Sequence, residues 1–392
     1  MVFPCYTGSM KALKLPFPYL RRSACILLIL FLTASFGGGC APKSGMGEVD
    51  FTPLNREDWS VSTPEKQGLD PDLVVRFYKD AAELDTLYGL LVVKNGNLVA
   101  ERYFNGGSMI TPVDLASVTK SFTSALMGIA LKKCDLDGLD QNMIDFFPEY
   151  ADQLVDPRKE EITLEQMLQM RSGYPWEEFT EPYFSELFSS GNWTPHLGDF
   201  PLTSDPGTEF GYSNLTAHAT GVIVAKACSK GLAALAEKYI LAPIGGKVSN
   251  WQRDPDGYNY GSGSLALTAR DAARFGLLYL NGGRYKNDQV IPADWVEASL
   301  DRYSTGIYGE QLGKYFRDLG YGYFWWSAKS GKHEFNYAWG HGGNLIVLVH
   351  DLDLVIVTTA SNLPGLSGEE SWKKEGAIID VVGKFIRSLP AD

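Results

Sequence analysis

Ser117 and Lys120 stand three residues apart in the segment ASVTKSF, residues 116–122, where an apolar, helix-like run begins. Side chains three residues apart share one face of a helix. A lysine held away from water has a lowered pKa and can take the proton of a neighbouring serine, which turns that serine into a nucleophile. The pattern alone is weak, because a chain of this length contains on the order of one match by chance. Ser371 and Lys374 form a second match.

The surroundings of the two serines differ. Ser117 follows a predicted strand hairpin and opens a helix whose other face is apolar, so we expect it at the edge of a hydrophobic core. Ser371 follows a Gly-Glu-Glu run near the C-terminus, where we expect an exposed, acidic helix start. Context therefore favours Ser117 as the nucleophile, while the residue types alone also fit an ordinary helix-start serine beside a solvated lysine.

The elements that position these residues are predicted from hydrophobic periodicity and turn residues. Two β-rich runs, 90–94 and 97–104, flank Asn95-Gly96, which is the strongest short signal for a hairpin. The other predicted elements are helices over 70–81, 117–131, 162–170, 215–227, 269–280 and 370–389, and strands over 323–326, 345–349 and 354–359. This order indicates an α+β fold, in which one antiparallel sheet comes from both termini and a helical lobe, about 117–300, is inserted.

The composition excludes some classes of protein. The chain has 392 residues, 45% of them hydrophobic and 21% charged, which is ordinary for a globular protein. Its formal net charge of −12 and the absence of a basic stripe argue against nucleic-acid binding. Cys134 and Cys228 lie in or just after apolar helical runs, so we expect two buried free thiols. Neither cysteine belongs to a metal-binding cluster, and Asp135-Leu136-Asp137-Gly138 lacks the spacing of a calcium loop, so we expect no metal.

The N-terminus has the pattern of an export signal. Basic residues within 11–22 precede the apolar run 24–32, which is followed by small residues up to Cys40. The apolar run is too short for a comfortable membrane span. Cys40 after three glycines is similar to the lipidated cysteine of a bacterial lipoprotein, although Gly37 replaces the usual leucine. We expect export with a lipid anchor at Cys40, and simple secretion is the alternative.

These patterns divide the chain into three parts. We predict a signal peptide over residues 1–39, a polar tether over 40–62 and a catalytic domain over 63–390. We expect the protein to be exported, either to the periplasm or as a membrane-anchored lipoprotein that faces away from the cytoplasm.

Six segments in order carry a family resemblance that covers about residues 65–388. The segments are LLVVKNGNLVAERYF, ASVTKSFTSALMGIAL, ITLEQMLQMRSG, PGTEFGYSN, GSGSLALTARDAARFG and GHGGNLIVLVHDLDLVIV. Together they resemble the serine β-lactamase and penicillin-binding superfamily, and within it the class C-like esterases and amidases, including 6-aminohexanoate-dimer hydrolases. The resemblance implies a β-lactamase/transpeptidase-like fold and an acyl-enzyme on Ser117, with Lys120 handling protons and no cofactor.

The family's second motif, Tyr-x-Asn, falls on Tyr212 and Asn214. The resemblance implies that the phenolate of Tyr212 relays protons and that Asn214 orients the lysine or the substrate. The alternatives are a packed loop tyrosine and a helix N-cap. Tyr279 and Asn281 also match the motif, but Asn281 precedes two glycines and is typical of a helix C-cap.

The family's third motif, Lys-Thr-Gly or His-x-Gly, lies on a strand that borders the site. Counting back from the strands at 345–357 places Ala338-Trp339-Gly340 at this position, with His341 next. The resemblance then implies that the backbone N–H groups of Ser117 and His341 form the oxyanion hole. Literal matches begin at His196, Lys329 and His341 itself. A proton-transfer role and a rim position for the His341 side chain remain equally open.

The same register predicts which residues bind the substrate. Trp339, Gly340, Gly342 and Gly343 are the predicted substrate-binding residues. Four aromatic residues are expected to line an apolar cleft or to fill the core: Trp325, Trp326, Tyr337 and Trp339.

An alanine in place of the family's lysine removes the anchor for a substrate carboxylate. We therefore expect a small ester or amide as the substrate. A β-lactamase or D-alanyl-D-alanine carboxypeptidase is the alternative, and a catalytically silent binding or sensor domain is an alternative of another class.

Overall fold

The computed structural model describes residues 49–54, 57–366 and 368–390, so the predicted signal peptide and Cys40 lie outside the described residues. Nine antiparallel strands form the main sheet in the order β2-β1-β14-β13-β12-β11-β10-β8, with β9 paired to β10. These strands are β1 Leu87–Lys94, β2 Asn97–Tyr103, β8 Ser304–Thr305, β9 Gln311–Leu312, β10 Phe316–Tyr321, β11 Trp326–Ser330, β12 His333–Gly340, β13 Asn344–Val349 and β14 Leu354–Ala360. The predicted hairpin is confirmed as β1 and β2, and β1 pairs with β14, so both ends of the domain build one sheet.

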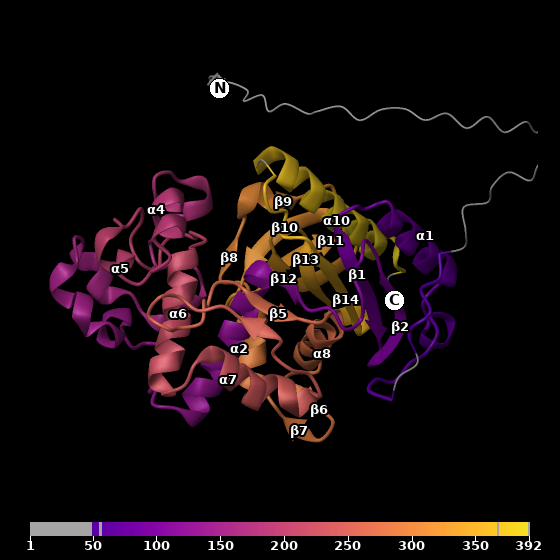
Figure 1. Cartoon of the computed structure of the whole chain (residues 1–392), viewed down its shortest axis with the longest axis horizontal. Coiled ribbons are helices and arrows are strands. Elements are labelled where there is room, and N and C mark those ends of the chain that lie inside the picture. The colour runs from indigo at the N-terminus through magenta and orange to yellow at the C-terminus, as the bar shows by residue number, and fades with distance from the viewer. Residues whose placement is uncertain (1–48, 55–56, 367, 391–392) are drawn as a thin grey trace, which may run out of the picture. The chain divides into compact units, whose positions relative to one another are not determined.

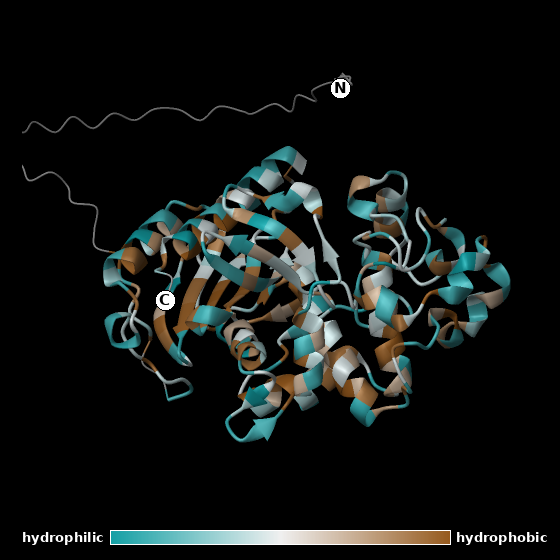
Figure 2. Cartoon of the chain, turned by 180° about the vertical axis from the view of Figure 1, so that it is seen from behind, coloured by the Kyte–Doolittle hydropathy of each residue, from teal (hydrophilic) through white to brown (hydrophobic). Residues whose placement is uncertain are grey.

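Helices cover both faces of this sheet (Figure 1). Helices α1 (Pro71–Ala82) and α10 (Gly368–Ser388) pack together on one face, where Phe77 and Phe385 stack with ring centroids 4.2 Å apart. Helix α8 (Ala269–Leu280) covers the other face against β1, β13 and β14. Because both faces are covered, every residue of β13 and β14 is buried, without the alternation of a half-exposed strand. Figure 2 shows strongly hydrophobic stretches in the strands of the sheet. The fold is therefore α+β, as predicted.

The remaining helices form a lobe beside the sheet (Figure 1). Its elements are α2 Thr119–Lys133, α3 Leu164–Leu168, α4 Tyr183–Ser190, α5 His196–Asp199, α6 Asn214–Ala227, α7 Leu232–Ala236 and α9 Ala293–Leu300. Two short sheets complete the fold. The first has three strands in the order β3 (Val113–Asp114), β5 (Leu265–Leu267) and β4 (Asn250–Trp251), and the second pairs β6 (Arg284–Tyr285) with β7 (Asp288–Gln289). In the described part of the chain, no single helix is long and apolar enough to cross a membrane; only α6 and the segment Leu232–Ile244, bent by 71°, pass that test together.

The two helices at the centre of the lobe, α2 and α6, are buried on nearly every side and pack against each other. Their C-terminal ends meet, and Cys134 and Cys228, the C-cap residues of the two helices, form a disulfide with Cα atoms 4.9 Å apart. The prediction of two free thiols is wrong. The cysteines are 94 residues apart, so the contact depends on helix packing and not on any local spacing.

Two other predictions need correction. The predicted strand 323–326 is a turn between β10 and β11 for most of its length, with Phe324 at a positive φ of 59°. Its aromatic residues are buried like those of a strand, which is why the apolar run was ambiguous. Residues 57–62 do not form a free tether: Asp58 binds Arg270 at 2.9 Å and Arg274 at 2.7 Å, and Val61 bridges to β2.

Candidate active site

Ser117 lies in a 3-10 turn, η2 (Ala116–Val118), between β3 and the start of α2. Ala116 has a φ of 48°, the left-handed region that a residue with a Cβ rarely adopts, and its N–H donates to Asp114 Oδ1 at 2.9 Å. Such local strain is concentrated at functional sites. The turn leaves Ser117 partly exposed at the entrance of a cavity, while the helix behind it is buried.

Lys120 stands one turn along α2, and its side chain is directed at Ser117. It is only 1% exposed, and its Nζ donates to Ser117 Oγ at 2.9 Å, Asn214 Oδ1 at 2.8 Å and the Ser262 carbonyl at 2.8 Å. Burial lowers the pKa of Lys120 to about 7, although the negative charges of Glu178 and Glu177 oppose the shift. A large fraction of Lys120 is therefore a neutral amine at neutral pH, able to accept a proton from Ser117.

Tyr212 packs beside Lys120 and Trp326. Its ring centroid lies 4.7 Å from Lys120 Nζ, and its ring stacks on Trp326. Burial raises the pKa of Tyr212 well above its usual value, and nearby glutamates act in the same direction, whereas an interaction with the Ser117 hydroxyl acts against them. Tyr212 therefore keeps its proton in the resting protein, in contrast to the expected phenolate. The group that can accept a proton here is Lys120.

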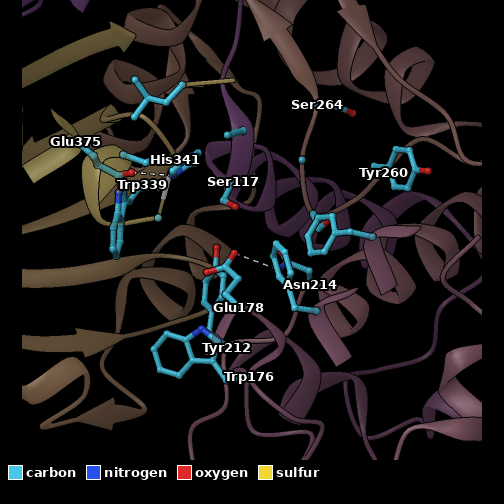
Figure 3. Close-up of a pocket in the computed structure, with 18 of the residues that line it drawn as sticks. Ser117, Trp176, Glu178, Tyr212, Asn214, Tyr260, Ser264, Trp339, His341 and Glu375 are labelled. Atoms are coloured by element: carbon cyan, nitrogen blue, oxygen red, sulfur yellow. Dashed lines mark hydrogen bonds and ion pairs between the residues drawn. The ribbon is translucent and has the colours of Figure 1, made fainter. Parts of the chain in front are cut away.

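Asn214 is the first residue of α6, and the N-cap is its neighbour Ser213, whose hydroxyl accepts from the Thr216 N–H at 3.0 Å. The side-chain amide of Asn214 connects Lys120 Nζ with Glu178 Oε1, to which it donates at 3.1 Å (Figure 3). Buried Glu177 accepts from the Asn214 N–H at 2.9 Å, and its burial raises its own pKa to about 7. Asn214 is thus fixed beside the lysine by its backbone and by its side chain.

The end of β12 crosses directly over the nucleophile turn. A Cβ built on Gly340 would lie 3.2 Å from the Ser117 nitrogen and would clash with the Leu115 carbonyl, so only glycine fits. The next residues turn the chain into β13, with φ of 86° at Gly342 and 92° at Gly343. This strand position agrees with the register that places Ala338-Trp339-Gly340 at the site, with His341 next.

A cavity of about 790 Å³ opens above Ser117 (Figure 3). Its lining is mainly aromatic and includes Trp176, Trp193, Tyr212, Tyr260, Tyr308, Trp326, Trp339 and Trp372. The ionisable side chains in its lining, besides the tyrosines, are Glu178, His341 and Glu375. The described lining therefore carries no lysine or arginine that could anchor a substrate carboxylate.

The structure separates the predicted cleft residues into two groups. Trp326 and Trp339 line the cavity, whereas Trp325 and Tyr337 are fully buried in the core. Gly340, Gly342 and Gly343 do not line it either, because a Cβ on Gly342 would meet the Ser361 carbonyl and one on Gly343 would press on Ile378. These glycines therefore shape the turn and its packing, and their contact with substrate stays a prediction.

The competing motif matches lie elsewhere. Lys329, on β11, pairs with Asp318 at 3.2 Å and Glu334 at 2.8 Å. His196 and Tyr279 are also outside the cavity lining, and Tyr279 packs against Trp325 in the core.

Ser371 is the exception among the competing residues. The prediction of an exposed position is wrong, because Ser371 is only 5% exposed. Ser371 lines the same cavity as Ser117. Sequence reasoning also missed Glu375, one helical turn further on, because nothing local indicates that α10 packs against the β12–β13 turn. No group of three or more His, Cys, Asp or Glu side chains that could hold a metal ion occurs among the residues with described positions.

A sheet with helices on both faces, a buried lysine bonded to a partly exposed serine and a large cavity above them are the features that a Ser-x-x-Lys hydrolase requires. The chain belongs to the β-lactamase family, whose model matches residues 86–377. A curated relative, the 6-aminohexanoate-dimer hydrolase of Paenarthrobacter ureafaciens, is 24% identical over 291 residues, which are 70% of this chain and 71% of the relative.

Solved structures agree on the fold. The octameric penicillin-binding protein homologue of Pyrococcus abyssi has a TM-score of 0.59 at 18% identity, with 80% of this chain and 77% of the other covered. A family VIII carboxylesterase has a TM-score of 0.57 at 14% identity, with 85% of this chain and 100% of the other covered. The predicted family, fold and enzyme class are confirmed.

Proposed function

We propose that this protein hydrolyses a small ester or amide through an acyl-enzyme on Ser117. The observation that carries the proposal is the 2.9 Å contact between Ser117 Oγ and the fully buried Lys120 Nζ. Lys120 takes the serine proton as Ser117 Oγ attacks the carbonyl carbon. Tyr212 donates its proton to the leaving group and regains one from the Lys120 ammonium, so both groups return to their starting states before water attacks, and Asn214 holds the lysine amine in position.

The oxyanion hole consists of the backbone N–H groups of Ser117 and His341. Support comes from the close passage of Gly340 over the Ser117 nitrogen, which brings the following residue to the same place. Each such donor is worth roughly 2.7–4 kcal/mol in other enzymes. Water then releases the acyl group, with Lys120 as the base, and restores the free serine.

The proposed substrate has an apolar or aromatic acyl group and lacks a carboxylate next to the scissile bond. The aromatic cavity favours such a group, and Glu178 and Glu375 disfavour an anionic one. The named activities of the relatives concern 6-aminohexanoate dimer, whose scissile bond is an amide, and carboxylic esters, which supports an ester or amide as the substrate. A β-lactam with its carboxylate would find no lysine or arginine partner in the described lining.

A p-nitrophenyl ester series with short acyl chains tests the function. We expect turnover by the wild type together with a covalent acyl adduct on Ser117, trapped by acid quench and found by peptide mass mapping. A wild-type protein that neither turns over these esters nor takes up any acylating probe would contradict the proposal and favour a silent binding domain. Nitrocefin turnover abolished by Ser117→Ala would instead favour the β-lactamase alternative.

We also propose that the protein is exported and anchored through Cys40. The N-terminal pattern of residues 1–39 and the Cys134–Cys228 disulfide support export, because disulfides persist in oxidising compartments. Fractionation of cells labelled with radioactive palmitate tests this, with Cys40→Ser as the control. Label and membrane association that persist in Cys40→Ser would contradict the anchor.

A further inference from the structure

Three side chains on the wall of the cavity form a second hydrogen-bonded chain. Ser371 Oγ lies 3.0 Å from His341 Nε2. His341 Nδ1 lies 2.8 Å from Glu375 Oε2, and Figure 3 shows this pair. Ser371 and Glu375 come from the first two turns of α10, and His341 comes from the β12–β13 turn. All three line the cavity above Ser117, so any group bound there can reach them.

Glu375 determines how the imidazole is oriented. Its carboxylate is completely buried and also accepts from the Trp339 indole N–H and from the Gly342 N–H at 2.9 Å. A carboxyl group that accepts from two other donors and lies 2.8 Å from His341 Nδ1 orients the ring with its Nδ1–H toward Glu375. Nε2 of the neutral ring then has its lone pair directed at Ser371, in position to accept the hydroxyl proton.

The lysine of the second Ser-x-x-Lys match is not available to Ser371. Lys374 Nζ pairs with Asp85 Oδ2 at 2.6 Å, and Lys374 does not line the cavity. His341 is therefore the residue that can serve Ser371 as a base. The arrangement of nucleophile, base and orienting carboxylate is the one that activates serine in unrelated hydrolases.

We propose that Ser371, with His341 as its base and Glu375 orienting that base, is a second nucleophile in the same cavity. Ser371 Oγ forms a bond to the acyl carbon of an activated ester as the bond to the leaving oxygen breaks. The serine proton passes to His341 Nε2 and from there to the leaving oxygen, so the products are an acyl-Ser371 ester and an alcohol. This reaction is independent of Ser117 and goes beyond the proposed function.

A purely structural role for the three residues predicts something different. Glu375 holds the turn through its bonds to Trp339 and Gly342, and a structural role for the contact between His341 and Ser371 requires no proton transfer. A structural role therefore leaves Ser371 unreactive at every pH. A nucleophilic role makes it reactive only when His341 is neutral.

The charges around His341 determine how the reactivity of Ser371 changes with pH. The hydrogen bond from His341 to Glu375 on α10 raises the pKa of the imidazole above its usual value, and Glu178 in η6 (Glu177–Phe179) acts in the same direction, whereas burial opposes them. The imidazolium at lower pH has no free lone pair. Modification of Ser371 should accordingly increase as pH rises through that pKa.

The test uses Ser117→Ala, in which the proposed main nucleophile is absent. This variant is incubated with an alkyl fluorophosphonate or p-nitrophenyl acetate between pH 6 and 9, followed by intact-mass measurement and peptide mapping. We expect one adduct on Ser371, forming faster at higher pH. Ser117→Ala/Ser371→Ala should take up no label, and Ser117→Ala/His341→Gln should react at least tenfold more slowly.

Two matched controls accompany these variants. Ser264 also lines the cavity, and its hydroxyl is buried without a hydrogen-bond partner in the structure, so Ser117→Ala/Ser264→Ala should keep the label. Ser117→Ala/Lys374→Met should keep it as well, and thermal melting establishes that each variant is folded. An unlabelled Ser117→Ala protein, or label that survives Ser371→Ala, would overturn the inference. The wild-type adduct on Ser117 tests the proposed function separately, so the two failures are distinguishable.

Discussion

The two Ser-x-x-Lys sequences of this protein have the same residue spacing and different physical chemistry. Lys120 is 1% exposed and bonded to Ser117, whereas the Lys374 side chain is 27% exposed and paired with Asp85 away from Ser371. Both serines nevertheless line one cavity, and each has a hydrogen-bonded nitrogen base, an amine for Ser117 and an imidazole for Ser371. Burial of the lysine, which the spacing does not encode, therefore decides whether this motif forms a reactive pair.

The largest expected difference between the two serines is in ester turnover. Ser117→Ala should lower kcat/KM for a p-nitrophenyl ester by about 10⁴-fold or more, the size seen when a serine nucleophile is removed. Ser371→Ala should cost less than about tenfold, because Lys120 and its partners remain intact. Steady-state kinetics on both variants measure the comparison. If Ser371→Ala were the more damaging change, the roles of the two serines would have to be exchanged.

The two lysines should differ by nearly as much. Lys120→Met removes the base that accepts the Ser117 proton, so kcat should fall by about 10²–10⁴-fold. Lys374→Met is the matched control, since it removes a partly exposed pair with Asp85 that has no contact with the cavity. Its kcat and KM should equal those of the wild type. Equal losses in the two variants would mean that the burial of Lys120 has no catalytic consequence.

Glu375 connects the two regions, because it holds both His341 and the turn that crosses over Ser117. Glu375→Ala leaves the Trp339 and Gly342 donors without an acceptor, so the proposed oxyanion donor at His341 loses its fixed position. We expect kcat to fall by about 10²-fold with little change in KM, because the donor acts on the transition state. Glu370→Gln, an exposed change on the same helix, should have no effect. A rise in KM with an unchanged kcat would place Glu375 in substrate binding instead.

The pH dependence should distinguish the two bases. The neutral amine of Lys120 is the reactive form, and its pKa is lowered to about 7, so kcat/KM should rise with pH below about 7 and level off above it. Between pH 6 and pH 8 the increase should be about tenfold. The same dependence should persist in Ser371→Ala. If it vanished there instead, the titrating group would belong to the His341 chain.

Much of the fold and several of the site residues could be predicted from the sequence. The hairpin, α1, α2, α6, α8, β13 and β14 have long periodic or continuous apolar patterns, and the order of motifs around Ser117 placed Tyr212, Asn214 and the Gly340 strand correctly. These features depend on residues close together in the chain. The register identified Ala338-Trp339-Gly340, with His341 next, at the site, although it could not say which of these side chains contact the cavity.

The missed features depend on packing between distant segments. Ser371 meets His341 only because α10 folds back over the β12–β13 turn, and Cys134 meets Cys228 only because α2 and α6 end together. The aromatic lining is similar: Trp176, Tyr308 and Trp372 come from three loops and helix ends that share no local pattern. A local pattern predicts a helix start but not the partner that a side chain meets there.

The smallest expected effect concerns what holds Lys120 in place behind Ser117. His218, on α6, and Asp254 are completely buried and 3.0 Å apart, and the Gly261 N–H donates to His218 Nδ1 at 3.3 Å. The next residue, Ser262, supplies the carbonyl that accepts from Lys120 Nζ. His218→Phe should therefore loosen this carbonyl and lower kcat by about tenfold. It should also move the pH midpoint downward, because the carbonyl stabilises the protonated amine.

A second histidine–aspartate pair provides the control for this positioning role. His333 Nδ1 and Asp351 Oδ2 lie 2.7 Å apart, with the His333 ring buried at the start of β12, far along the strand from His341. His333→Phe should lower the melting temperature as His218→Phe does, because each change removes the two hydrogen bonds of a buried ring, to Asp351 and the Leu389 carbonyl in one case and to Asp254 and the Gly261 N–H in the other. Only His218→Phe should shift the midpoint of the pH profile. An equal shift in both variants would mean that general loosening of the fold, and not loss of the Ser262 carbonyl, changes the pKa of Lys120.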